Sequence, residues 1–363
     1  MPVIPFVLKS MAAAAFGLAA ALALPGVPAH AEPKAEKSAA GFGVRAWSEV
    51  VVSVTDLEAS SAWLVEDGGW RKTSAGALSK SELNYWGLPD AVSGVFLKIC
   101  APDTDQAGCI RFVRLDGAGE QRPIRLAARP WDTGGIFSIM LRTSNARAMF
   151  DAAIARGWWA ESQPYEFSFG GSDLVNVVIR APHGVNYALY ERKSPAFTGF
   201  PVGKLSRAFN TMRMVKDQPA SLAWYRDRLR LGVLFDAPFT DPEPRVNNFS
   251  VPANLATKLV RRAAVVQPEL PGEAGRIELM AFEGFEGRDF SEYASFPNLG
   301  IISVRYPVLA FDDYRATLEQ GSVTIERDGS TLAISALGQE GAAIDMFAVR
   351  DPDGNLTEFY RAK

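Results

Sequence analysis

The sequence predicts an α+β fold built from four copies of one βαβββ module. In each copy a β-rich apolar stretch is followed by an amphipathic helix and then by several short strands. The copies begin at Glu49, Phe137, Asn210 and Leu299, which gives steps of 88, 73 and 89 residues. Two long steps around a short one indicate a pair of pairs, and one helix among several strands favours α+β over a doubly wound sheet.

Each module opens with one strand and one helix. The opening strands are predicted over residues 49–54, 137–141, 210–215 and 299–304. The helices are predicted over 57–63 and 145–156, through Leu222, Tyr225 and Leu229 in the third copy, and over 311–318. Asp56, Ser144 and Asp217 are the predicted N-caps of the first three helices, because their side-chain oxygens can accept the unpaired N–H groups of a first helical turn. Gly157 is predicted to end the second helix.

The N-terminal residues are predicted to be a secretory signal peptide. Lys9 is followed by an apolar, Ala-rich run from Met11 to Leu24 and then by Ala29-His30-Ala31. A short basic region, a short apolar stretch and an A-x-A ending define such a peptide, and the run is shorter than the roughly 20 residues of a membrane helix. We therefore expect residues 1–31 to be removed and the protein to be periplasmic or secreted, without stable membrane insertion. A retained anchor is the alternative, and residues 32–44 are expected to form a flexible lead-in.

Composition and cysteine usage restrict the partners and the compartment. The formal net charge of −3 gives no electrostatic footprint for nucleic acid. Cys100 and Cys109 flank a turn-rich segment between two apolar runs, so an exported chain is expected to join them by a disulfide. Two unpaired buried thiols are the alternative. The sequence contains no Walker loop, no H-E-x-x-H and no G-x-S-x-G motif.

Three segments resemble the glyoxalase / bleomycin resistance protein / extradiol dioxygenase (vicinal oxygen chelate) superfamily. Residues 210–231 (NTMRMVKDQPASLAWYRDRLRL) are similar to the opening strand and helix of glyoxalase I, and 276–284 (RIELMAFEG) to its strand that supplies a carboxylate. Residues 351–359 (DPDGNLTEF) resemble the closing turn and strand found across the superfamily. The resemblance implies two cup-like domains of mixed β-sheet. By chain order these are 45–193 (modules one and two) and 205–363 (modules three and four), with a swapped pairing as the alternative.

In this superfamily, each cup holds a divalent metal through four residues of the first and last strands of its modules. Carried onto modules three and four, these positions are Asn210, Glu278, Leu299 and Glu358; onto modules one and two, they are Glu49, Arg111, Phe137 and Ala188. Leucine cannot ligate a metal, which leaves Asn210, Glu278 and Glu358 as the expected ligands of Mn²⁺, Mg²⁺ or Ca²⁺. Glu49 beside Arg111 instead predicts a salt bridge or an anion-orienting pair.

The histidine count excludes one family activity. His183 is the one histidine outside the predicted signal peptide, and it occupies in Ala181-Pro182-His183-Gly184 the place that Asp353 has in the closing turn. We therefore interpret His183 as a turn residue. Because a non-haem iron oxygenase needs two histidines and one carboxylate, an ordinary extradiol dioxygenase is excluded.

Two functions follow from the resemblance. In the first, a bound metal polarises a small substrate while Glu278 or Glu358 acts as a base in lyase- or isomerase-type chemistry. In the second, the cup binds and sequesters a small molecule without metal, as bleomycin-resistance proteins do. Either function predicts a small-molecule ligand and a monomer or homodimer. The candidate ligand contacts are Asn210, Arg288, Phe282 and Tyr360.

Overall fold

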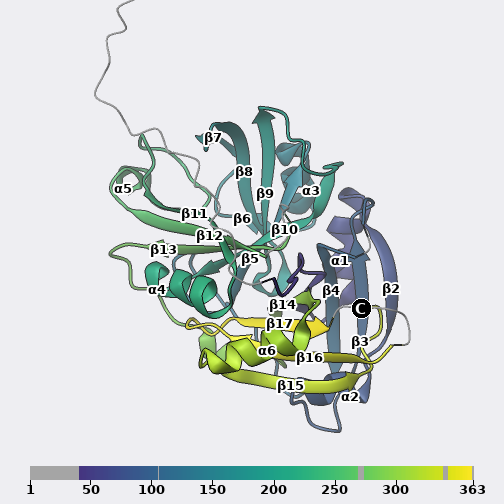
Figure 1. Cartoon of the computed structure of the whole chain (residues 1–363). Helices are drawn as coiled ribbons and strands as arrows, with labels where there is room; N and C mark the ends of the chain where they lie inside the picture. Colours follow the sequence, from purple (N-terminus) through teal and green to yellow (C-terminus); the bar gives the residue numbers. More distant parts are fainter. Residues whose placement is uncertain (1–40, 105, 269–273, 338–341, 362–363) are drawn as a thin grey trace, which may run out of the picture. The chain divides into compact units, whose positions relative to one another are not determined.

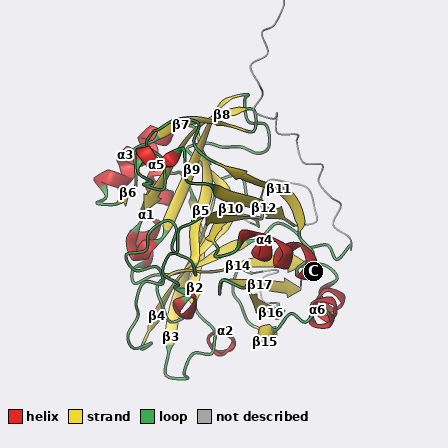
Figure 2. Cartoon of the chain, turned by 90° about the vertical axis from the view of Figure 1, so that its left-hand side faces the viewer, coloured by secondary structure: helices red, strands yellow, loops and turns green. Residues whose placement is uncertain are grey.

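The computed structural model describes residues 41–104, 106–268, 274–337 and 342–361. The predicted signal peptide lies outside these residues. Strands make up most of the regular structure (Figure 2). Within the described segments, we find no helix that is both long enough and apolar enough to cross a membrane.

The four predicted modules are all present. The first contains β1 (Glu49–Ser53), β2 (Arg71–Ala77), β3 (Ser93–Cys100) and β4 (Cys109–Asp116). The second contains β5 (Ile136–Thr143), β6 (Trp159–Ala160), β7 (Tyr165–Phe169), β8 (Ser172–Arg180) and β9 (Asn186–Ser194). The third contains β10 (Leu205–Met214), β11 (Gly232–Phe239), β12 (Arg261–Gln267) and β13 (Arg276–Phe282). The fourth contains β14 (Gly300–Val308), β15 (Ile325–Leu332), β16 (Ile344–Arg350) and β17 (Leu356–Arg361).

The helices are short. They are α1 (Leu57–Ala62), α2 (Lys80–Tyr85), α3 (Ala146–Ala155), α4 (Gln218–Ala223), α5 (Ala253–Ala256) and α6 (Phe311–Gln320). Asp56 and Asp217 cap α1 and α4 as predicted, each accepting an N–H of the first turn at 3.0 Å. The cap of α3 is Asn145 and not the predicted Ser144, because the extended backbone of Asn145 lets its side chain accept the N–H of Ala148 at 2.9 Å.

Each sheet joins two modules, but not the two that chain order predicted to pair. One sheet has eight strands in the order β15-β16-β17-β14-β1-β4-β3-β2, and the other follows β11-β12-β13-β10-β5-β9-β8-β6, with β7 paired to β8. Module one therefore pairs with module four, and the last strands of the chain lie beside the first (Figure 1). The grouping expected from chain order, 45–193 and 205–363, is not the one adopted. Two antiparallel pairs replace it, β1 with β14 and β5 with β10.

Modules one and two, and likewise modules three and four, contact each other through buried side chains instead of through strand edges. In modules three and four, the Arg213 guanidinium lies 3.3 Å from Asp351 Oδ2, and the Tyr225 hydroxyl donates to the same oxygen at 2.6 Å. In modules one and two, the Trp63 indole donates to the carbonyl of Met149 at 3.1 Å. These contacts belong to a core that draws residues from all four modules.

Residues 41–44 belong to the predicted flexible lead-in, but they are packed on the fold. Val44 is 3% exposed and forms a β-bridge with Val308. The Phe42 ring lies 5.3 Å from that of Tyr314. The apolar side chains of Phe42 and Val44 explain why this end of the segment is ordered.

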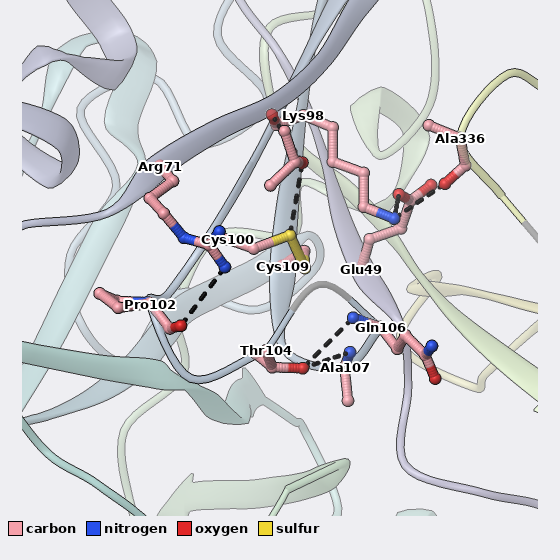
Figure 3. The surroundings of a disulfide bond; sticks show 11 residues. Glu49, Arg71, Lys98, Cys100, Pro102, Thr104, Gln106, Ala107, Cys109 and Ala336 are labelled. Carbon is pink, nitrogen blue, oxygen red and sulfur yellow. Dashed lines mark hydrogen bonds and ion pairs between the residues drawn. A yellow bond between two sulfur atoms is a disulfide. The ribbon is translucent and has the colours of Figure 1, made fainter.

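The predicted disulfide is confirmed. Cys100 and Cys109 are bonded where β3 ends and β4 begins, and both are fully buried (Figure 3). In the turn between them, Thr104 Oγ1 accepts the N–H groups of Gln106 and Ala107 at 3.2 and 3.3 Å. The hairpin is thus held together by the disulfide and by the hydrogen bonds that the Thr104 hydroxyl accepts.

Replacing both cysteines by alanine should lower the free energy of unfolding by roughly 2.7 kcal/mol, because the bond restricts a loop of ten residues in the unfolded chain. Urea denaturation of the oxidised wild type and of the Cys100→Ala/Cys109→Ala variant measures this loss. Adding a reductant should bring the wild type to the midpoint of the variant. Equal midpoints without reductant would contradict the prediction.

Candidate functional site

The strand registers define equivalent positions in the four modules. Glu49 on β1 is aligned with Cys109 on β4, and Asn210 on β10 is aligned with Arg276 on β13. Arg111 and Glu278 each follow two residues after these partners, on the same face because side chains alternate along a strand. They are therefore equivalent, as the sequence predicted.

The same rule corrects two assignments in modules two and four. Ser303 is aligned with Leu356, two residues before Glu358, and Ser138 is aligned with Asn186, two residues before Ala188. Ser303 and Ser138 thus occupy the positions that sequence comparison assigned to Leu299 and Phe137. Both assignments were out of register: Leu299 precedes β14, and Ser138, not Phe137, is the residue aligned with Asn186.

The corrected positions and the swapped pairing separate the predicted metal ligands. The eight-stranded sheet carries Glu49, Arg111, Ser303 and Glu358, and the nine-stranded sheet carries Ser138, Ala188, Asn210 and Glu278. Asn210 and Glu278 therefore lie together, whereas Glu358 lies on the other sheet. The expected set of Asn210, Glu278 and Glu358 is not assembled.

On the eight-stranded sheet, the equivalent positions belong to a buried charged cluster. We define this cluster as Glu49, Glu82, Lys98, Arg111, Arg305 and Glu358, none of which is more than 5% exposed. Arg305 lies at its centre, 2.9 Å from Glu49 and 2.9 Å from Glu358. Arg111 pairs with Glu82 at 3.0 Å. Three carboxylates thus balance three cations, which is the condition for burying charge at acceptable cost.

Two segments cover the charged cluster. Helix α2, capped by Ser79, brings Glu82 into it. Residues 333–337 supply carbonyl groups. That of Ala336 accepts from Lys98 at 2.8 Å (Figure 3). That of Ser335 accepts from Arg111 at 2.9 Å.

Electrostatics favours the ionised form of Glu49 in the charged cluster. Burial by itself would raise the pKa of the Glu49 carboxyl, but the charges of Lys98, Arg111 and Arg305 outweigh that effect and lower it. Glu358 also accepts the Ser303 hydroxyl at 2.6 Å. Tyr360, a candidate ligand contact, lies on this same sheet and is 6% exposed. Glu358 therefore belongs to the buried charged cluster, and Tyr360 packs in a buried apolar cluster of the same sheet.

The corresponding side of the nine-stranded sheet is apolar. We call it the methionine face, defined by Met140, Met212, Met214 and Met280, which are at most 3% exposed. Phe137, Phe209, Phe249 and Phe282 pack with them. Phe282, predicted as a ligand contact, meets the Phe249 ring edge-on at 5.4 Å. Thioether side chains are unbranched and polarisable, and they adapt to ligands of irregular shape.

Glu278 is the carboxylate of the methionine face. It is half-buried, and Asn210 Nδ2 donates to its Oε2 at 3.5 Å. Within the described part of the chain, no ion pair reaches it, so burial raises the pKa of Glu278 to about 7. Burial also raises the pKa of the Tyr190 hydroxyl, and the charge of Glu278 raises it further, which places Tyr190 near this carboxylate.

The donors around Glu278 do not fit a resident divalent metal. Asn210 directs its amino group toward the carboxylate, which leaves Asn210 Oδ1 turned away from Glu278. Ser138 adds only a hydroxyl, and Ala188 offers no oxygen. In the described segments, no three His, Cys, Asp or Glu side chains gather in a metal-binding group. One carboxylate with these neighbours offers fewer oxygen ligands than the sites that hold Mg²⁺, Mn²⁺ or Ca²⁺.

Arg288 and His183 have other partners. Arg288, a candidate ligand contact, lies 3.1 Å from Asp132 and also donates its backbone N–H to that carboxylate. His183 Nε2 accepts the N–H of Thr55 at 3.4 Å, as Asp353 Oδ1 accepts that of Lys216 at 2.8 Å. His183 thus has the turn role predicted for it.

Changing Glu49 to Gln should lower the free energy of unfolding by about 3–5 kcal/mol, because Lys98 and Arg305 would lose a buried counter-charge. Urea denaturation measures the loss, and elemental analysis of both proteins should show no change in metal content. A variant that keeps its stability and loses a bound metal would contradict the structural role of Glu49.

Comparisons with known proteins agree with this architecture. No family model matches the chain, and no curated protein sequence does. Among solved structures, a variant of glyoxalase I from Zea mays matches with a TM-score of 0.58 and 14% identity, over 88% of this chain and 93% of the other. Unmodified glyoxalase I from Zea mays gives 0.57 and 13%, over 87% and 92%. A putative dioxygenase from Bacillus subtilis gives 0.52 and 9%, over 88% and 86%. The chain has the fold of the glyoxalase / dioxygenase (vicinal oxygen chelate) superfamily.

Proposed function

We propose that the methionine face binds a small, largely apolar molecule and that Glu278 exchanges a proton with it, in isomerase- or lyase-type chemistry. The observation that carries this proposal is the pKa of about 7 of a carboxyl that no cation pairs with in the described segments. A general base works best when its pKa lies near the operating pH, since it is then both available and strong enough.

The contrast between the two sheets supports a functional role for Glu278. On the eight-stranded sheet, the buried carboxylates of Glu49, Glu82 and Glu358 are all matched by cations. Glu278 has no such partner, so its ionisation costs free energy and contributes nothing to the fold. Ionisable groups whose pKa is shifted in this way, and which lie on an apolar face, are characteristic of functional sites.

The neighbours of Glu278 suit proton transfer next to a carbonyl. The Glu278 carboxylate would take a proton from carbon, which converts it to the neutral acid and leaves an enolate on the substrate. The acid then returns the proton to the second carbon or to oxygen. Ser138 Oγ is buried without a hydrogen-bond partner in the described segments, and it can donate to the developing oxyanion. Asn210 orients the carboxylate through its amino group.

Binding without chemistry is the second candidate function. Four methionines and four phenylalanines on one face can accommodate an apolar ligand by repacking alone. No second carboxylate joins Glu278 on this face among the described residues. The exchange experiment below separates the two candidates.

We also propose that the protein is exported. The short apolar run and A-x-A ending of residues 1–31 support this, and so does a disulfide of the kind found in oxidising compartments. Mass spectrometry of the protein from its native cells should find an N-terminus at Glu32. A chain that starts at Met1 in the cytosol would overturn the proposal.

Changing Glu278 to Gln should stabilise the protein above pH 7. The folded-state pKa is raised from 4.5 to about 7, so the folded protein favours the protonated form and loses stability as the pH rises between these values. The variant should lack this loss, which amounts to at most about 3 kcal/mol. Urea midpoints at pH 5 and pH 8 test it, with Glu358→Gln as the matched control that should destabilise. A Glu278 variant that is less stable than wild type at pH 8 would contradict the assignment.

Phenylacetone is a suitable probe for proton transfer, because its benzylic C–H lies next to a carbonyl. Proton NMR in D₂O should show faster hydrogen–deuterium exchange with wild type than with Glu278→Gln, by at least about 100-fold. The rate should rise with pH to a plateau just above 7. If both proteins bind the probe by saturation-transfer NMR but exchange it equally slowly, the binding function replaces the catalytic one.

A further inference from the structure

A cavity lies outside the methionine face. It has a volume of about 450 Å³ and is formed by three segments, residues 123–127, 157–159 and 180–184. Neither Glu278 nor any methionine lines it. The volume falls within the range of roughly 300–1,000 Å³ that small-molecule sites occupy.

The surroundings of this cavity carry an excess of positive charge. Arg180 pairs with Glu161 at 3.2 Å, and Arg288 pairs with Asp132 at 3.1 Å. Arg125 donates instead to backbone carbonyls, including that of Gly134 at 2.8 Å. Three guanidinium groups thus face two carboxylates.

The arginines act on one another electrostatically. Burial lowers the pKa of Arg125, the charge of Asp132 opposes this, and the charges of Arg180 and Arg288 lower it again, to about 9. The group remains protonated at neutral pH, but its cationic form is held in an unfavourable field. One added negative charge would stabilise the protonated form of Arg125.

Arg180 is held in place by hydrogen bonds and still has an unused hydrogen-bond donor among the described residues. Its Nε donates to Asn186 Oδ1 at 3.3 Å and one amino group donates to the carbonyl of Ala128 at 3.1 Å. Its other amino group, NH1, finds no acceptor in the described segments. The guanidinium also stacks over the Trp159 ring at 4.4 Å. A donor held in this way needs little reorganisation to bind an anion.

The cavity walls are apolar and exposed. Trp159 is 46% exposed and Leu126 is 51% exposed, although both are large apolar side chains. The chain holds this arrangement with two residues in the left-handed region, Ala127 (φ 51°) and His183 (φ 62°). Such backbone conformations are costly and tend to occur where a site requires them.

We propose that this cavity binds a small planar monoanion, of which an aromatic carboxylate is the type. The carboxylate accepts from the unoccupied amino group of Arg180, and the ring lies against Trp159 and Leu126. A single surplus guanidinium matches one negative charge, and stacked arginine and tryptophan favour a flat partner. The site is independent of the function proposed for Glu278.

Benzoate and its neutral analogue benzamide provide a matched pair of probes. Titrations of the full-length mature protein, followed by calorimetry and by tryptophan fluorescence, should show saturable benzoate binding at least about tenfold tighter than benzamide binding. Trp159→Ala should weaken benzoate binding severalfold, and we expect the variant to fold because the Trp159 side chain is 46% exposed. Glu278→Gln should bind benzoate as wild type does, which distinguishes this cavity from the methionine face.

The variant Arg180→Gln/Glu161→Gln removes the donor and keeps the local charge balanced, and it should abolish the preference for benzoate over benzamide. Its thermal unfolding midpoint serves as the folding control, with Trp159→Ala as the second variant should it fail to fold. The proposal is overturned if benzoate binding is not saturable below about 10 mM, or if it survives unchanged in both variants.

Discussion

The antiparallel pairing of opening strands between modules one and four and between modules two and three is the constraint on which the rest of the structure depends. Because side chains alternate along a strand, the register of β1 against β14 and of β5 against β10 decides which residues share a face. It brings Glu358 to Glu49 and leaves Glu278 with Asn210 and Ser138. The chemistry available on each sheet follows from this pairing more than from the residues of any single module.

The two sheets treat equivalent positions in opposite ways. On the eight-stranded sheet, α2 and residues 333–337 cover a neutral set of three carboxylates and three cations. Such a set is stable only while every partner is present, since removing one leaves a buried charge. On the nine-stranded sheet, methionine and phenylalanine surround one carboxylate that lacks a cation. In the first arrangement every ionisable group has a buried partner of opposite charge. In the second, Glu278 has none among the described residues, which is why we propose it as the group that exchanges a proton.

Local features could be predicted from the sequence, and long-range pairing could not. The caps Asp56 and Asp217 and the Cys100–Cys109 disulfide depend on residues close in the chain, and the structure confirms them. Asn210 and Glu278 lie in one module, so their proximity was predictable too. Glu358 was grouped with them because chain order favoured pairing modules three and four, and nothing local distinguishes that pairing from the swapped one. The cavity beside Arg180 was missed because its three walls lie apart in the sequence.

The turns that close modules two and four show why the sheets are not independent domains. His183 accepts the backbone N–H of Thr55, just after β1, and Asp353 accepts that of Lys216, just after β10. Each turn therefore ties a strand of one sheet to a strand of the other. The turn with His183 also lines the cavity beside Arg180. A ligand held there would contact the segment that joins modules one and two as well as the turn of module two. It would thus stabilise the junction between the sheets, and not one sheet alone.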